Sequence, residues 1–453
     1  MNDTICAPAT APGGALGIIR VSGPAALAAV SAISRLDGQG ITANTIHYTH
    51  ILQGSEVVDE VMVSIFRAPH SYTGEDSIEI SCHGSRYIMN KVLELLMQHG
   101  CRMAHAGEFT QRAYLNGKLD LSQAEAVADL IASTNKATHL LAMSQLRGGI
   151  SSELAILREQ LLKMTTLLEL ELDFSDHEDL EFADRSELLE LANKIDKHII
   201  QLALSFEKGQ AIKNGIPVAI VGKTNVGKST LLNALLKDER AIVSDVHGTT
   251  RDTIEDTIDI QGVTFRFIDT AGIRQTNDQV EQIGIQRTYQ AMEKARIVLW
   301  IVDQQPTAEE IQEILNRITD KHLIITLNKI DIDGHHSLKA STFSHINHCS
   351  VVSISAKHRL HIEQLEQAIY DAANLPSFTD TDVIITNARH YEALTRAQSG
   401  IRRVMENIQQ QLSGDLLAED LRDIIDTLSE ITGGQITPNE VLGNIFKNFC
   451  IGK

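Results

Sequence analysis

The sequence has no apolar run long enough to cross a bilayer. A transmembrane helix needs roughly 20 predominantly apolar residues, and no window of the 453 residues approaches that pattern. The first ten residues, MNDTICAPAT, contain neither the basic segment nor the apolar core of a secretory signal. These absences predict a cytoplasmic protein without membrane association.

Cysteine is also scarce. The five cysteines are scattered, odd in number and never spaced as a Cys-x-x-Cys pair. This distribution argues against a disulfide framework and against a structural zinc site, and it fits a reducing compartment.

A basic stripe is missing as well. The chain has 40 Lys and Arg residues against 59 Asp and Glu residues, so its net charge is −19. Proteins that bind nucleic acid without a partner carry clustered Lys and Arg, because much of their affinity comes from neutralising phosphates. Any work on RNA is therefore expected to need a more basic partner or a local basic patch.

The secondary-structure pattern of the sequence changes along the chain. Residues 1–118 mix short β-type runs with Gly-rich turns and one helical stretch, which predicts an α+β domain. Leucines at helical spacing dominate 119–214, strands alternate with helices in 215–375, and helical periodicity returns in 376–453. This order predicts an α/β domain inserted into an all-α helical domain.

The α/β segment has the alternation typical of a mostly parallel, doubly wound sheet. Its expected strands are Pro217–Val221, Thr264–Ile268, Ile297–Val302, Leu323–Leu327 and Val351–Ser355. Its expected helices are Lys228–Leu236, Gln282–Lys294, Ala308–Arg317 and Ile362–Ala373.

A phosphate-binding loop follows the first of these strands and opens a helix. The segment reads Gly-Lys-Thr-Asn-Val-Gly-Lys-Ser and ends at Lys228 and Ser229, which matches the P-loop pattern in the required context. Its glycines let backbone N–H groups converge on phosphate oxygens. We expect Lys228 to span the β- and γ-phosphates and Ser229 to ligate Mg²⁺, with further contacts from Val226, Gly227 and Thr230.

Three later segments each follow a predicted strand, and open α/β sheets bind ligands at that edge. They are Asp269-Thr270-Ala271-Gly272, Asn328-Lys329-Ile330-Asp331 and Ser355-Ala356-Lys357. Asp269 can reach the metal, and Asp331 can accept both N1–H and N2–H₂ of guanine, a donor pair that adenine lacks. The expected nucleotide is therefore GTP, bound by a Ras-like G domain.

A polar loop between the P-loop helix and the next strand has the length of a switch segment that orders on the γ-phosphate. It contains Ser244, Asp245, Val246, His247, Gly248, Thr249 and Thr250. We predict Thr250 as the second hydroxyl on Mg²⁺. Ile273 stands where Ras-type switches place a glutamine that orients the attacking water, so another group, with Glu281 or Asp278 nearest in sequence, must do that work.

With these motifs inside a helical domain, and with Phe-Cys-Ile-Gly-Lys at its end, the whole chain resembles the TrmE (MnmE) family of tRNA-modification GTPases. The resemblance implies a constitutive homodimer whose N-terminal domain binds a tetrahydrofolate. It also implies an FAD-containing partner of the MnmG type, joined in a heterotetramer, and tRNA as the substrate. Together the partners add an aminomethyl or carboxymethylaminomethyl group at C5 of the wobble uridine.

The resemblance also implies a potassium ion in place of an arginine finger, held by the Asn225 side chain and by backbone carbonyls of Ser244, Val246 and Thr249. A cation there would neutralise charge that develops on the phosphates. The water-orienting glutamate falls on Glu281, which the residues alone would place as a solvated helix-start carboxylate.

The ligands of 5-formyltetrahydrofolate or a related folate fall on Arg20, Glu79, Lys118 and Lys453 by the same resemblance. Cys450, in the terminal Cys-Ile-Gly-Lys, is assigned to the catalytic site without a derived role. Two other functions remain open from the sequence. One is a GTPase switch in ribosome or RNA assembly, and the other is a folate-dependent one-carbon transferase with a regulatory G domain.

Overall fold

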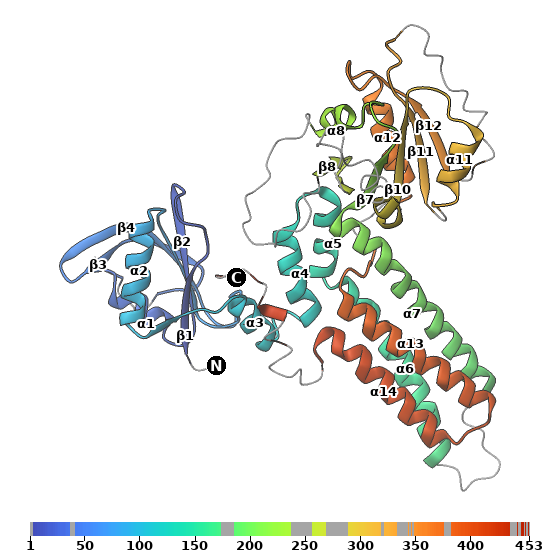
Figure 1. Ribbon diagram of the computed structural model, residues 1–453. Helices are drawn as coiled ribbons and strands as arrows, with labels where there is room; N and C mark the ends of the chain where they lie inside the picture. The colour runs from blue at the N-terminus through green and yellow to red at the C-terminus, as the bar shows by residue number, and fades with distance from the viewer. Residues whose placement is uncertain are drawn as a thin grey trace. The chain divides into compact units, whose positions relative to one another are not determined.

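A computed structural model describes residues 3–36, 41–173, 185–236, 256–268, 289–318, 321–332, 343, 346, 348–375, 382–434, 442, 445–447, 449 and 452 (Figure 1). The chain forms two compact units. Unit 1 comprises Met1–Ala132, Ala142–Ala203 and Arg389–Lys453, and unit 2 comprises Ser133–Leu141 and Leu204–Ala388. Unit 2 thus interrupts unit 1 in sequence, as the predicted insertion requires.

Unit 1 begins with a six-stranded sheet in the order β3-β4-β5-β2-β1-β6, in which only the β1–β6 pair is parallel. The strands are β1 Thr4–Pro8, β2 Leu16–Ser22, β3 Thr45–Gln53, β4 Glu56–Phe66, β5 Ser77–His83 and β6 Cys101–Met103. Buried and more exposed residues alternate along β4 and β5, so one face of the sheet packs on the helices α1 (Ala26–Ala32) and α2 (Arg86–Gln98).

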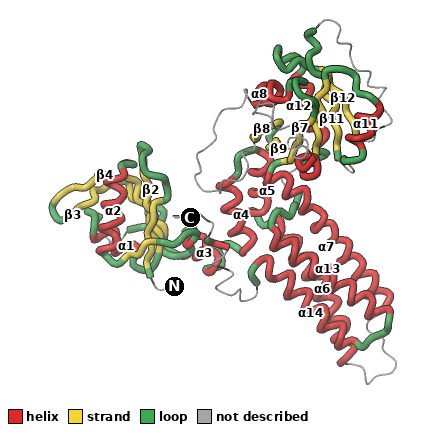
Figure 2. The backbone as a smooth tube through the Cα atoms, viewed as in Figure 1, coloured by secondary structure: helices red, strands yellow, loops and turns green. Residues whose placement is uncertain are grey.

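The rest of unit 1 is helical, and α6 runs alongside α14 (Figure 2). The apolar stripe of α14 repeats at helical spacing through Leu417, Leu421, Ile424, Leu428 and Ile431, all buried. The helices are α3 Glu108–Leu115, α4 Leu121–Ala132, α5 Lys136–Leu146, α6 Gly149–Asp173, α7 Arg185–Asn214, α13 Ala388–Gln409 and α14 Gly414–Thr432, of which α5, α7 and α13 also extend into unit 2.

Unit 2 contains a second six-stranded sheet, in the order β12-β11-β10-β7-β9-β8. All neighbouring pairs are parallel except β8–β9 at one edge. The strands are β7 Ile216–Val221, β8 Asp256–Ile260, β9 Val263–Ile268, β10 Ile297–Val302, β11 His322–Leu327 and β12 Cys349–Ser353. The helices named within this unit are α8 Lys228–Leu236, α11 Ala308–Leu315 and α12 Ile362–Ala372, and residues 289–294 are also helical.

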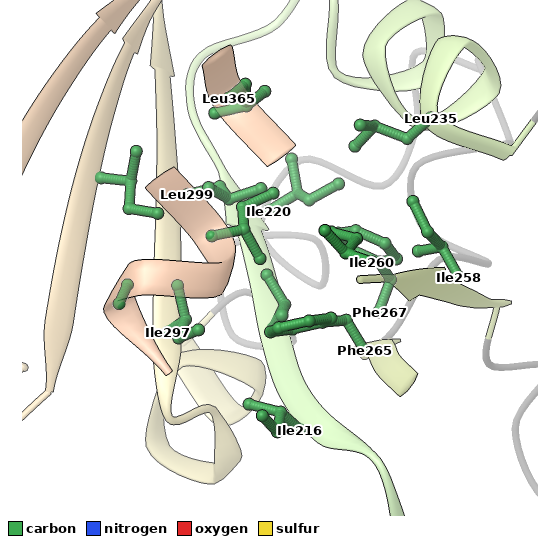
Figure 3. Close-up of a cluster of buried hydrophobic side chains, with 14 of the residues drawn as sticks. Ile216, Ile220, Leu235, Ile258, Ile260, Phe265, Phe267, Ile297, Leu299 and Leu365 are labelled. Atoms are coloured by element: carbon green, nitrogen blue, oxygen red, sulfur yellow. The ribbon is translucent and has the colours of Figure 1, made fainter. Parts of the chain in front are cut away.

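The central strands of this sheet are covered on both faces. All six residues of β10 are buried, which is the pattern of a parallel strand with helices on both sides. Figure 3 shows one of the two cores, where Ile216, Ile220, Phe265, Ile297 and Leu299 gather beside the sheet. The predicted fold class, a mostly parallel G-type domain inserted into a helical domain behind an α+β domain, is confirmed.

Two local expectations for the sheet need correction. Strand β8 is not predicted, because a five-residue edge strand with alternating polar positions gives a weak period-two signal. Strand β12 ends at Ser353 rather than Ser355, because the backbone of Ser355 exchanges hydrogen bonds with Leu360 instead of continuing the ladder. No helix in the described ranges is both long enough and apolar enough for a membrane span.

Candidate functional site

The P-loop of unit 2 connects β7 to α8 and depends on residues with left-handed backbone. Gly227 has φ +103°, and a Cβ there would lie 2.2 Å from Asn328 Nδ2. Asn225, at the exposed turn of the loop, has φ +63°, a conformation that asparagine tolerates better than most residues. The loop can therefore approach both its neighbour and a ligand closely, as phosphate binding requires.

The Lys228 ammonium lies folded over this loop. Its Nζ donates to the carbonyls of Gly222 and Lys223, both at 2.7 Å. Partial burial lowers the pKa of Lys228 below its ordinary value. The ammonium is thus held at the first turn of α8, beside the backbone N–H groups that the P-loop pattern assigns to phosphates.

Asn328 joins three parts of the site through one buried side chain. Its Nδ2 donates to the Val226 carbonyl at 2.8 Å, and its Oδ1 accepts from the Ala356 N–H at 2.9 Å. The residue is only 3% exposed. The P-loop and two of the loops that follow parallel strands are therefore fixed to one another by a single amide, whose structural task the motif alone did not reveal.

The side chains expected to bind guanine lie at the same edge of the sheet. Asp331 is exposed and faces His358, with Oδ2 3.5 Å from Nε2, and a hydrogen bond from Ser355 is the main cause that lowers the pKa of Asp331. Lys329 has φ +67° and pairs with Asp303 at 2.9 Å. Asp331 is thus an ionised acceptor open to a ligand, in the state that two guanine donors need.

The remaining positions of this predicted site fall outside the described residues. They are Ser244, Asp245, Val246, His247, Gly248, Thr249, Thr250, Asp269, Thr270, Ala271, Gly272 and Glu281. Their roles on Mg²⁺, K⁺ and water stay predictions. Among the described positions, Ser229 and Thr230 lie in the first turn of α8, directly after Lys228.

Unit 1 holds a second cluster, centred on Arg20. Arg20 and Glu79 face each other across β2 and β5, and Arg20 donates from Nε and from a terminal nitrogen to Glu79 Oε1 at 2.9 and 2.7 Å. The Lys118 ammonium donates to the Pro69 carbonyl at 3.1 Å. The structure therefore joins two of the expected folate ligands directly, and their charges partly offset each other.

Two aromatic residues that the sequence reading missed complete this cluster. The Arg20 guanidinium lies 5.5 Å from the Tyr72 ring centroid and 5.7 Å from that of Phe109, within the range of a cation–π interaction. Tyr72 also hydrogen-bonds Thr110 at 2.9 Å. Neither aromatic has a local sequence signature, because the contact exists only once β2, the 71–75 turn and α3 pack together.

The C-terminal segment reaches the same cluster. Arg20 donates to the Gly452 carbonyl at 3.2 Å. Gly452 has φ +94°, and a Cβ there would lie 2.1 Å from the Pro8 carbonyl oxygen, so only glycine fits. Its neighbours Cys450 and Lys453 lie outside the described residues.

Comparison with known proteins gives matches along the chain. Residues 4–118 match the family model described as the GTP-binding protein TrmE N-terminus, and residues 121–450 match the MnmE helical domain. Among solved structures, the G domain of the T. maritima FeoB iron transporter is 23% identical, covers 35% of this chain and 98% of that chain, and has a TM-score of 0.26.

Full-length relatives are more similar. The tRNA modification GTPase MnmE of Bacteroides fragilis is 55% identical over 465 residues and covers 100% of both chains. The protein of the same name from Bacteroides thetaiotaomicron is 54% identical with the same coverage. That of Flavobacterium johnsoniae is 49% identical, over 100% of this chain and 99% of its own. These matches span the chain from end to end.

Proposed function

This chain belongs to the MnmE (TrmE) family of tRNA modification GTPases, and from that membership we propose how its own residues hold and hydrolyse GTP. The P-loop N–H groups and Lys228 bind the β- and γ-phosphates, Asp331 reads the guanine edge, and Ser355–Lys357 closes over the base. The observation that carries this assignment is the Asn328 amide, which hydrogen-bonds Val226 of the P-loop and Ala356 of the loop after β12 and so holds both loops together. Preorganised donors of this kind stabilise charge on a transferring phosphoryl group.

The residues present fit a magnesium ion and a potassium ion. Ser229 places a hydroxyl at the start of α8 next to Lys228, and Asn225 offers a carbonyl oxygen from an exposed, left-handed turn. Oxygen donors are what these hard cations prefer. When bound, the cations would neutralise charge on the phosphates. Thr250 would supply the second hydroxyl to Mg²⁺, the carbonyls of Ser244, Val246 and Thr249 would bind K⁺, and Glu281 would orient the attacking water.

The Arg20 cluster fits a tetrahydrofolate such as 5-formyltetrahydrofolate. Its half-buried Arg20–Glu79 pair combines guanidinium donors with a carboxylate acceptor, which suits a pterin edge and folate carboxylates. Lys118 and Lys453 would add cations, and the contact of Gly452 with Arg20 supports a place for Cys450 near this ligand.

The proposed substrate is the wobble uridine of certain tRNAs, modified at C5 together with an FAD-containing partner of the MnmG type in a heterotetramer. The chain itself acts as a homodimer in the cytoplasm, and paired G domains use K⁺ in place of an arginine finger. The net charge of −19 supports a complex in which the partner makes most of the contacts with tRNA.

Mass spectrometry of nucleosides from total tRNA tests this function. Cells lacking the protein are complemented with wild type, Asn225→Ala or Cys450→Ser. We expect only wild type to restore the modified wobble uridine. An unchanged nucleoside profile in the deletion strain would contradict the role of this chain in that modification.

GTP hydrolysis by the purified protein in K⁺ and in Na⁺ at equal ionic strength tests the cation assignment separately. We expect faster hydrolysis in K⁺ for wild type and equal rates for Asn225→Ala. Asn233→Ala, on α8 outside the loop, serves as the matched control and should keep the K⁺ preference. If Asn225→Ala retains that preference, Asn225 is not a potassium ligand.

A further inference from the structure

Helix α11 contacts the P-loop through the ion pair of Glu310 with Lys223, although it belongs to none of the nucleotide-binding motifs. Its apolar residues Ile311, Ile314 and Leu315 pack on the same core as Met292 and Val302. Side chains at the start of α11 contact the P-loop, and side chains at its end and just after it contact helix 289–294.

The N-terminal end of α11 holds the P-loop. Thr307 and Glu310 form a capping box, in which Glu310 Oε2 accepts from the Thr307 N–H at 3.0 Å. The other oxygen of Glu310 forms an ion pair with the Lys223 ammonium. This ion pair, helped by the Thr307 N–H, holds the pKa of Glu310 below its ordinary value.

The position of Lys223 affects where the Lys228 ammonium lies. It directly follows Gly222, and its carbonyl is one of the two that receive Lys228 Nζ. The backbone position of Lys223 therefore sets where the Lys228 ammonium rests, although the Lys223 side chain itself is 66% exposed.

The C-terminal end of α11 holds the helix 289–294. The Tyr289 hydroxyl donates to Glu313 Oε1 at 2.6 Å, and the Arg317 guanidinium lies 3.6 Å from the centroid of the Tyr289 ring. Helix 289–294 follows, in sequence, the segment that begins at Asp269 and includes Glu281, the predicted water-orienting residue.

We propose that α11 is a clamp that fixes the P-loop and helix 289–294 to one rigid element, and that Glu310 is a positioning residue for nucleotide binding. Glu310 acts through Lys223 and does not touch the nucleotide. The inference rests on the proposed GTP site. Because P-loop N–H groups bind phosphates only from one loop conformation, a loop released from α11 should let the nucleotide leave faster.

The experiment measures the release rate of a fluorescent N-methylanthraniloyl GDP from the full-length protein. Glu310→Gln keeps a hydrogen-bond acceptor for the capping box but removes the ion pair. Glu309→Gln is the matched control, because it removes the same charge from the same helical turn and Glu309 forms no ion pair with Lys223 among the described residues. We expect release from Glu310→Gln to be about three-fold faster than from Glu309→Gln, the scale of an exposed ion pair.

Two further measurements separate a clamp from a general change in stability. In a Lys223→Met background, Glu310→Gln should have no added effect on the release rate, because the pair is already broken. The three-fold difference should shrink in 1 M salt, where exposed charges are screened, while the single-turnover hydrolysis rates of Glu310→Gln and Glu309→Gln stay within about two-fold of each other.

Equal release rates from Glu310→Gln and Glu309→Gln would overturn the clamp, and so would full additivity with Lys223→Met. Absence of nucleotide binding by wild type would instead contradict the proposed function. The two failures are therefore distinguishable.

Discussion

The nucleotide site of unit 2 and the Arg20 cluster of unit 1 are assembled from different kinds of chain segment. The nucleotide site consists of short contiguous motifs placed at or just after the ends of parallel strands, so each motif can be read locally even though the strand order of the sheet differs from the order along the chain. The Arg20 cluster combines two antiparallel strands, the 71–75 turn, helix α3 and a residue more than 400 positions away in sequence.

This difference explains why one site leaves local sequence motifs, whereas the residues of the other can be predicted only from the family resemblance. Backbone N–H groups that bind phosphate need glycine and a following helix, and such local requirements leave a local pattern. Cross-strand pairs depend on register, and any two polar residues can face each other once the sheet has formed. The predictions below test whether each site behaves as its construction implies.

The largest effect is expected in the nucleotide site, from Asp331→Asn. The change replaces the proposed ionised acceptor of two guanine hydrogen bonds with an amide that both donates and accepts. Losing charged hydrogen bonds worth about 3 kcal/mol should weaken GTP binding about 100-fold. Xanthosine triphosphate, which presents a carbonyl where guanine has its amino group, should bind better than GTP. Titration calorimetry with both nucleotides checks this, and an unchanged preference for GTP would remove Asp331 from the base site.

An intermediate effect is expected in the Arg20 cluster, from Gly452→Ala. The added Cβ would lie 2.1 Å from the Pro8 carbonyl in a left-handed backbone, a strain of about 1–3 kcal/mol. The C-terminal segment should detach and become more susceptible to carboxypeptidase. Gly434→Ala is the control, because its nearest neighbour would lie at 3.6 Å and its backbone is not left-handed. Equal digestion of both variants would show that Gly452 does not anchor the C-terminus.

The smallest effect is expected from acid, and it should separate the two units. Burial raises the pKa of Glu108, but hydrogen bonds from Arg102, from the His105 N–H and from Arg112 bring it below its ordinary value. A carboxyl with a depressed folded pKa stabilises the fold above its unfolded pKa, and that contribution disappears as pH falls through the folded value. The N-terminal domain should therefore weaken as the pH falls below about 4.5.

Among the described residues of unit 2, the carboxyls with lowered pKa, Asp331 and Glu310, are on the surface or close to it, so acid should affect this unit less. Trp300, the single tryptophan of the chain, is buried in β10 and reports on unit 2. We expect hydrogen exchange of residues 101–115 to accelerate at a higher pH than the change in Trp300 fluorescence. Simultaneous transitions would mean that the Glu108 network does not control acid stability.

The secondary structure of unit 2 is largely predictable because its strands are buried runs bounded by turns. β10 is expected and observed at Ile297–Val302, and α8 at Lys228–Leu236. The edge strand β8 is missed for the opposite reason, since solvent on one side leaves it polar at alternate positions. In the N-terminal domain, the β-type runs Gly17–Val21, Glu60–Phe66 and Ser77–Ser81 and the helical stretch Tyr87–His99 predict β2, β4, β5 and α2, but no predicted run corresponds to β1, β3 or β6.

The sequence by itself determined the fold class, the guanine-nucleotide motifs and the family, because each depends on residue types at short, fixed spacing. Only the tertiary structure decided that Asn328 ties two loops together, that Tyr72 and Phe109 flank Arg20, and that α11 holds Lys223 and Tyr289. These contacts join residues distant in the chain. Their partners become neighbours only when the sheets and helices pack, so no local pattern can record them.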